Sequence, residues 1–284
     1  MMLLLQEFSY HLPMESLQAR MEALARAHRG QVRFYAKSLA TGESVELDAD
    51  EPVRSASTIK LGILVEAFHQ AGEGRLPLSG KVVLREEDKV QGSGVLKFLR
   101  APLELTLEDV LTLMVIESDN TATNLAIDQV GLNAVNARFA ALGLKNTRLY
   151  KKVYKPAEGP LPPDQKEFGL GKTTAREMSR LMEEAARDER MTAILKGQQN
   201  RNMIPRYIEA GLDASEGGAI VANKTGALDA QRSDVGAVFS PAGTILVSAF
   251  TDGNEDQRWT CENEAEGLIA QLAKTVFDSW GRKK

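Results

Sequence analysis

The sequence contains few of the side chains on which thiol, imidazole and metal chemistry depend. It has one cysteine, Cys261, and only three histidines in 284 residues, which are His11, His28 and His69. One cysteine excludes an internal disulfide bond. No histidine stands in a recognisable motif, so a Ser-His-Asp triad is disfavoured. No spacing of His, Cys, Asp and Glu suggests a metal site, and we expect neither a metal nor an organic cofactor.

Long apolar runs and a strong net charge are also missing. No run approaches the ~18 residues that a membrane-spanning helix needs. The formal net charge of -4 gives no reason to expect nucleic acid or an anionic membrane as a partner. Residues 1–7 contain three leucines and no preceding basic segment, which is too little for the core of an export signal. The compartment and the oligomeric state are left open.

Periodic apolar residues predict strands near both ends of the chain and helices in the middle. The strand-like segments are residues 31–39, 44–47, 219–224, 234–240 and 244–251. The helix-like segments are 14–27, 61–71, 104–115, 122–130, 133–142, 174–187 and 264–280, with Thr106 and Thr173 or Thr174 as N-caps. We therefore predict an α/β fold of the α+β type, with an antiparallel sheet flanked by helices. Residues 1–50 and 200–284 would form a discontinuous α/β lobe, and residues 51–199 an all-α lobe.

Three short motifs occur in order along the chain. Ser57-Thr58-Ile59-Lys60 precedes an apolar helical run, and residues three apart on a helix share one face, so Ser57 and Lys60 can touch. A serine hydroxyl beside a lysine amine is a nucleophile with its base. A helix N-cap is the alternative reading of the serine alone. The other two motifs are Ser118-Asp119-Asn120 and Lys224-Thr225-Gly226.

Together these motifs resemble the S-x-x-K, S-D-N and K-T-G set of class A β-lactamases and penicillin-binding proteins. The resemblance extends from about Gln31 to the C-terminus and includes the order of the predicted elements. It implies the β-lactamase and transpeptidase fold, a small β-lactam or peptide substrate, and a serine hydrolase that forms an acyl-enzyme. Members of the family are usually periplasmic or secreted.

The resemblance implies a catalytic role for three residues. Ser57 would attack an amide or lactam carbonyl, and Lys60 would accept its proton. Ser118 would carry a proton to the leaving nitrogen, and a helix cap is the alternative for this residue. Asn120 would hold a side-chain amide of the substrate and contact Lys60. Asp119 would cap the helix that it begins.

Four further residues are implied for substrate binding, and two roles are open for a fifth. The backbone N–H of Ala227 would complete an oxyanion hole with that of the nucleophile. Lys224 and Thr225 would bind a substrate carboxylate, and Gly226 would let the substrate lie against the strand edge. Arg232 stands near the position of a carboxylate-binding arginine of the family, and an ordinary surface arginine is the alternative.

The sequence departs from the family at the step that releases the acyl group. Class A β-lactamases deacylate with a glutamate on the loop before the helix at 174–187, and the corresponding position here falls at or near Val153. Residues 150–172 form a proline-rich segment of the kind that is usually functional or mobile. The other acidic candidates are Glu117, Glu158, Asp164 and Glu167. Without a positioned base, hydrolysis of the acyl-enzyme loses ~10²–10⁴-fold, so we predict slow deacylation.

Three functions remain open from the sequence. The first is a class A-like β-lactamase that acylates readily and turns over slowly. The second is a related D-Ala-D-Ala-type peptidase or esterase, which shares the same nucleophile and base. The third is a non-catalytic binding module that keeps the cleft. The presence of Ser57 and Lys60 together argues against the third, because binding alone requires neither.

Overall fold

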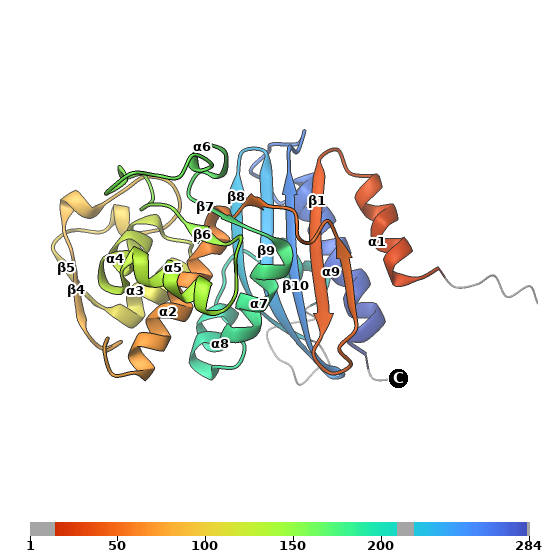
Figure 1. The fold of residues 1–284 in the computed structure, drawn as a ribbon, viewed down its shortest axis with the longest axis horizontal. Helices are drawn as coiled ribbons and strands as arrows, with labels where there is room; N and C mark the ends of the chain where they lie inside the picture. Colours follow the sequence, from red (N-terminus) through yellow and green to blue (C-terminus); the bar gives the residue numbers. More distant parts are fainter. Residues whose placement is uncertain (1–14, 209–218, 283–284) are drawn as a thin grey trace, which may run out of the picture.

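A five-stranded antiparallel sheet forms the centre of the protein, whose computed structural model describes residues 15–208 and 219–282 (Figure 1). The strand order is β2-β1-β10-β9-β8. The strands are β1 (Gln31–Ser38), β2 (Ser44–Leu47), β8 (Ile220–Leu228), β9 (Gln231–Ser240) and β10 (Gly243–Asp252). Strand β1 pairs with β10, so segments from opposite ends of the chain lie side by side. Strand β8 forms one edge of the sheet.

One face of the sheet is covered by the two terminal helices, α1 (Leu17–Arg26) and α9 (Glu264–Trp280), on the right of Figure 1. Helix α9 places Ile269, Leu272 and Val276 in one buried cluster with apolar side chains of the sheet. The spacing of three and four residues is that of an amphipathic helix on a core. The helix has the bounds that the sequence predicted.

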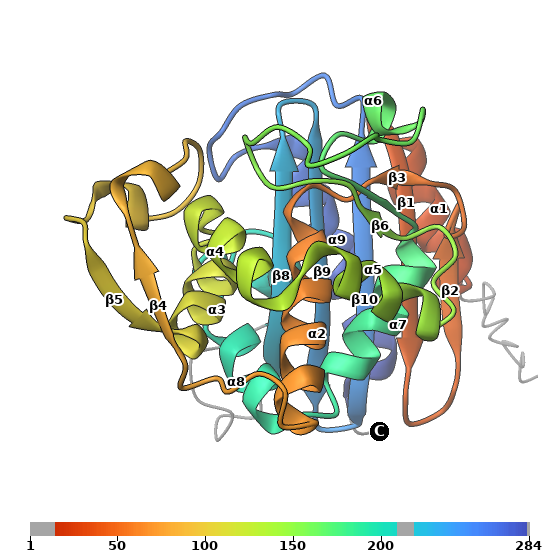
Figure 2. The same ribbon diagram turned by 60° about the vertical axis from the view of Figure 1, so that its left-hand side comes forward.

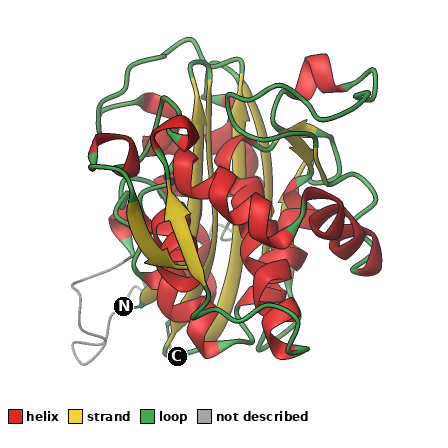
Figure 3. Cartoon of the chain, turned by 90° about the vertical axis from the view of Figure 1, so that its left-hand side faces the viewer, coloured by secondary structure: helices red, strands yellow, loops and turns green. Residues whose placement is uncertain are grey.

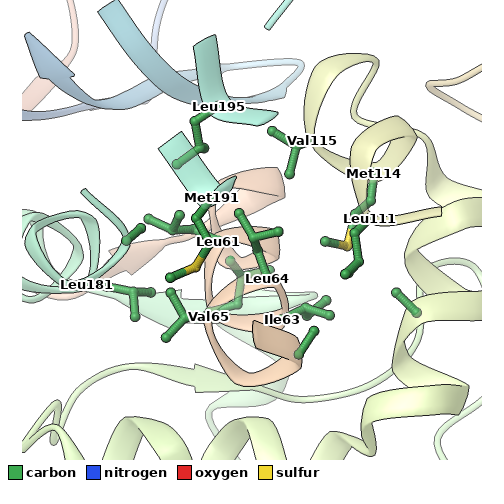
Figure 4. Close-up of a cluster of buried hydrophobic side chains, with 14 of the residues drawn as sticks. Leu61, Ile63, Leu64, Val65, Leu111, Met114, Val115, Leu181, Met191 and Leu195 are labelled. Carbon is green, nitrogen blue, oxygen red and sulfur yellow. The ribbon is translucent and has the colours of Figure 1, made fainter. Parts of the chain in front are cut away.

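The opposite face is covered by α2 (Lys60–Gly72), α7 (Ala175–Ala185) and α8 (Glu189–Lys196), and α2 passes in front of the sheet in Figure 2. Helices α3 (Leu107–Ile116), α4 (Asn120–Val130) and α5 (Leu132–Ala141) pack against α2. Helix α2 is buried on nearly all sides, and Leu61, Ile63 and Leu64 lie in the cluster of Figure 4. The core therefore fixes the position of Lys60, the first residue of this helix.

The middle of the chain also contains short strands outside the central sheet (Figure 3). The strands are β3 (Val53–Arg54), β4 (Lys81–Leu84), β5 (Leu103–Thr106), β6 (Arg148–Leu149) and β7 (Gly171–Thr173). The remaining elements are α6 (Gln165–Phe168) and the 3-10 helices η1 (Ala56–Ile59), η2 (Glu86–Asp88), η3 (Leu96–Phe98) and η4 (Ile204–Tyr207). Residues 51–199, which were predicted to form an all-α lobe, therefore also contain short strands. Strands of two to four residues give too little alternation to be seen in the sequence.

The main prediction for the fold, an antiparallel sheet flanked by helices, is confirmed. Thr106 and Thr174 cap α3 and α7 by accepting bonds from backbone N–H groups three residues later. The division into two lobes stays a prediction. The predicted start of the first helix at Met14 lies outside the described residues. Within residues 15–208 and 219–282, no helix has both the length and the apolar character needed to cross a membrane.

Candidate active site

Ser57 lies in η1, the 3-10 turn that joins β3 to α2. Its neighbour Ala56 has φ +45°, a left-handed conformation that is uncommon for a residue with a Cβ. Strand β8 passes close to this turn, since a Cβ built on Gly226 would lie 3.0 Å from the amide nitrogen of Ser57. The side chain of Ser57 is half-buried. The turn therefore presents a partly accessible hydroxyl beside an edge strand.

Lys60 is fully buried, and its amine reaches towards the S-D-N motif. Its Nζ donates to the backbone oxygen of Ser118 at 2.7 Å, to Ser118 Oγ at 3.1 Å and to Asn120 Oδ1 at 2.9 Å. In the described parts of the chain, no hydrogen bond joins Lys60 Nζ to Ser57 Oγ. Burial lowers the pKa of Lys60 well below its ordinary value, and the nearby charge of Lys224 lowers it further, against the opposing effect of Asp119.

The S-D-N motif lies between α3 and α4 and ties three segments together. Ser118 has φ +52°, a second left-handed residue beside Lys60. Asp119 caps α4 by accepting from Ala122 N, as predicted, and its other oxygen accepts from the amides of Val95 and Leu96. This carboxylate therefore also holds the 92–96 loop against the motif. Such strained residues persist where the surrounding contacts determine the backbone.

The K-T-G motif lies on edge strand β8, close to Ser57. Lys224 is fully buried, and its Nζ donates to the backbone oxygen of Thr225 at 2.7 Å. Burial lowers the pKa of Lys224 to about 7, against the opposing effect of Asp234. Gly226 continues the strand to Ala227, which pairs with the next strand. The motif thus supplies a buried cation and a strand edge facing the nucleophile.

A cleft of about 200 Å³ brings several of the predicted residues together. It is lined by Ser57, Ser118, Thr225, Gly226 and Ala227, and by residues that the sequence did not single out. Glu117, one of the acidic candidates, also lines the cleft, and the residues that the sequence did not single out are Ser93, Ile116, Gln198, Gln199, Asn200, Met203 and Trp259. Most of these come from loops without a motif. A tryptophan in the polar segment 252–263 was the one signal that could have drawn attention to Trp259.

Arg232 does not lie with the predicted carboxylate-binding residues. Its guanidinium donates to the backbone oxygens of Leu228, Gln231 and Arg258, and its Nε lies 3.4 Å from Glu266 Oε1 of α9. Arg232 therefore points to the α9 side of the sheet. The predicted contact with a substrate carboxylate does not fit this geometry, because the two terminal nitrogens of the guanidinium donate to backbone oxygens and its Nε faces Glu266.

The 150–172 segment brings no loop carboxylate to the cleft. Val153 is held by Asn124, whose side-chain amide exchanges two hydrogen bonds with the Val153 backbone at 2.8 and 2.9 Å. Glu158 pairs with Lys152, and Asp164 pairs with Lys172, which lowers the pKa of that aspartate.

Glu167 lies exposed on the short helix α6. Glu117 directly precedes Ser118 and is the one acidic candidate among the cleft-lining residues. The cleft-lining position is explained by the end of α3 at Ile116, because Glu117 is already outside the regular helix.

Neither of the two described histidines lines the cleft that contains Ser57. His28 Nε2 lies 2.9 Å from Asn254 Oδ1, and His69 Nδ1 lies 3.8 Å from Oε1 of Glu73, the C-cap residue of α2. His11 lies outside the described residues. No group of three or more His, Cys, Asp or Glu side chains in residues 15–208 and 219–282 is arranged to hold a metal ion.

Comparison with known proteins identifies the family. Residues 16–280 match the β-lactamase enzyme family. A β-lactamase of Amycolatopsis lactamdurans is 24% identical over 273 residues, covering 95% of this chain and 87% of the relative. The crystal structure of a β-lactamase from Sphaerobacter thermophilus has a TM-score of 0.79 at 32% identity, covering 93% of this chain and 96% of that one. A mutant of PBP-A, solved as an acyl-enzyme complex with penicillin G, has a TM-score of 0.76 at 26% identity, covering 93% and 95%. The chain belongs to the β-lactamase enzyme family and is a β-lactamase-like hydrolase.

Proposed function

We propose that Ser57 attacks the carbonyl of a β-lactam to form an acyl-enzyme that is released slowly. The observation that carries this proposal is the buried amine of Lys60, one helical turn after Ser57 and hydrogen-bonded to Ser118. Its lowered pKa increases the neutral fraction of the amine, which is the form that accepts a proton. As Ser57 Oγ bonds to the carbonyl carbon, its proton passes to Lys60.

Ser118 connects Lys60 to the leaving group. When the carbon–nitrogen bond of the lactam breaks, the nitrogen needs a proton. Ser118 Oγ, 3.1 Å from Lys60 Nζ, would donate its proton to the nitrogen and recover one from the lysine. This transfer returns Lys60 to its neutral form. Asn120, which accepts from Lys60 Nζ, holds the amine in line for both steps.

The rest of the cleft would bind the substrate and its developing charge. The backbone N–H groups of Ser57 and Ala227 would stabilise the oxyanion, since both residues line the cleft and preorganised donors favour that charge. Lys224 and Thr225 would bind the substrate carboxylate. Thr225 lines the cleft, and Lys224, fully buried next to it, would supply positive charge behind this contact.

We expect slow deacylation because residue 153 is a valine without a carboxylate, and because Glu158 and Asp164 form ion pairs with lysines. A missing general base costs ~10²–10⁴-fold in rate. Among proteins of this fold, the PBP-A mutant was captured with penicillin G bound as an acyl-enzyme. The same site chemistry would serve a D-Ala-D-Ala-type peptidase or esterase, which is the second candidate function. The lack of a deacylating carboxylate from the 150–172 segment favours it as a companion activity.

Intact-mass spectrometry after mixing with benzylpenicillin tests the proposal. We expect a persistent adduct of the mass of the antibiotic, and no adduct on Ser57→Ala. A rapid return to the unmodified mass, with penicilloate accumulating, would contradict slow deacylation. The absence of both adduct and hydrolysis would contradict the acyl-enzyme itself. A D-Ala-D-Ala dipeptide substrate and a thioester, tested in parallel, distinguish the second candidate by release of their leaving groups.

A further inference from the structure

Trp259 stands out because a large apolar side chain is exposed beside the proposed nucleophile. It is 66% exposed, and it lines the same cleft as Ser57, Thr225 and Ala227. A single exposed apolar residue needs no explanation, but one at the wall of a reactive cleft is placed to contact a ligand. Trp259 is not part of any of the three motifs.

The indole ring of Trp259 lies against the guanidinium of Arg232, which hydrogen bonds hold in place. The guanidinium carbon of Arg232 lies 4.6 Å from the centre of the ring, within the range of a cation–π contact. Arg232 is fully buried, and three of its hydrogen bonds, at 2.7 to 2.8 Å, end on backbone oxygens. One of these oxygens belongs to Arg258, the residue directly before the tryptophan. The arginine therefore holds both the ring and the backbone that carries it.

The loop around Trp259 is fastened at a second point. Asn263, the N-cap of α9, donates to the backbone oxygens of Asp256 and Arg258 at 3.1 and 2.9 Å. The Asp256 carboxylate accepts from the amide of Glu264 at 2.8 Å. These bonds connect the tryptophan loop to the start of a well-packed helix. A ring held in this way loses little conformational freedom when a ligand covers it.

We propose that Trp259 forms an apolar wall that contacts a ring or alkyl group of the bound substrate, and that Arg232 positions this wall. The proposal rests on the proposed function of the Ser57 cleft. It gives Arg232 a positioning role in place of direct contact with a carboxylate. The substrate class is then an acyl donor that carries an apolar group within reach of the cleft wall.

The experiment compares acylation of the wild-type chain with Trp259→Ala and Trp259→Phe, by intact mass, using benzylpenicillin and 6-aminopenicillanic acid. We expect Trp259→Ala to lower the second-order acylation rate constant about tenfold, mainly through weaker binding, with Trp259→Phe within about threefold of wild type. A larger loss with benzylpenicillin places the contact on its phenylacetyl group. An equal loss with both places it on the bicyclic nucleus, which the two share.

Tyr207→Ala is the matched control. Tyr207 is also an exposed aromatic residue, 45% exposed, and its ring lies 5.3 Å from the guanidinium carbon of Arg206, but it does not line the cleft. We expect this variant to acylate like wild type. Acylation of Trp259→Ala within twofold of wild type for both penicillins would overturn the inference. Wild-type protein that is never acylated would instead overturn the proposed function.

The positioning role is tested by Arg232→Lys in a Trp280→Phe background, where Trp259 is the sole tryptophan. We expect acrylamide to quench the fluorescence of Trp259 more strongly once the guanidinium is replaced. We also expect weaker binding of benzylpenicillin with an unchanged limiting acylation rate. Unchanged quenching and unchanged binding would overturn the role of Arg232. If Arg232→Lys does not fold, Arg258→Ala serves as the comparison, because it keeps Arg232. The backbone oxygen of residue 258 remains in that variant, so normal quenching is expected.

Discussion

Gly226→Ala is predicted to push strand β8 away from the η1 turn that carries Ser57, without removing any functional group. A Cβ at this position would lie 2.7 Å from Ser233 Oγ, 3.0 Å from the amide nitrogen of Ser57 and 3.1 Å from that of Thr58. Comfortable contacts of this kind are ~3.5 Å or longer, so β8 must move away from η1 by roughly 0.5 Å. Overpacking of this size costs about 1–3 kcal/mol of stability. Because a 1 Å misplacement can cost ~10²-fold, we expect acylation to slow at least tenfold.

The assay combines the rate of penicillin acylation by intact mass with thermal unfolding. Gly267→Ala is the matched control, because a Cβ at Gly267 on α9 meets nothing within 4 Å and alanine is the better helix former by about 1 kcal/mol. We expect the control to acylate normally and to unfold at the same or a higher temperature. A Gly226→Ala protein that is folded and acylates within twofold of wild type would refute the claim that this close approach aligns the cleft.

Three further predictions concern the chemistry of the site. The limiting acylation rate should fall as the pH drops through the pKa of Lys60, because the protonated amine cannot accept a proton. Lys224→Met should move this fall to higher pH, because removing a like charge raises the pKa of Lys60. Stopped-flow rates at saturating penicillin from pH 5 to 9 check both expectations. Val153→Glu should speed deacylation by about 10²-fold or more, seen as shorter survival of the adduct, whereas Val153→Gln should not. Glu158→Gln should leave deacylation unchanged, since that carboxylate pairs with a lysine, and Glu117→Gln should slow it about tenfold; equal rates for both variants would remove Glu117 as a base.

The sequence predicted those parts of the fold whose apolar pattern repeats over many consecutive residues. Helix α9 was predicted with its bounds, because its apolar residues repeat over almost five turns. Strand β5 was taken as the start of α3, although the N-cap at Thr106 was identified correctly. A cap marks where a helix begins, so residues 104–106 had to lie outside it. The two-residue strands β3 and β6 are set by pairing with β7, which no local pattern reports.

The candidate site divides in the same way. Ser57, Lys60 and Ser118 were recognised from motifs, and the structure brings them to one cleft or joins them by hydrogen bonds. The direction of Arg232 could not be predicted, because a shift of one residue in a strand reverses the face on which a side chain lies. Trp259 was missed because its place beside the cleft depends on the fold of a loop from the far end of the chain.

The pairing of β1 with β10 has a consequence for the order of events during synthesis. Val32 pairs with Thr251, so β1 cannot pair with β10 until the residues up to Thr251 have left the ribosome. Such distant pairings slow folding and prolong exposure of unpaired strand edges. Strand β8, which carries Lys224, also emerges late. During most of its synthesis, a nascent chain therefore contains Ser57 without the strand that would hold a substrate against it. A ribosome-bound fragment that ends before β8 is therefore expected to be unreactive towards penicillin, and reactivity should appear only in fragments that include β8 to β10.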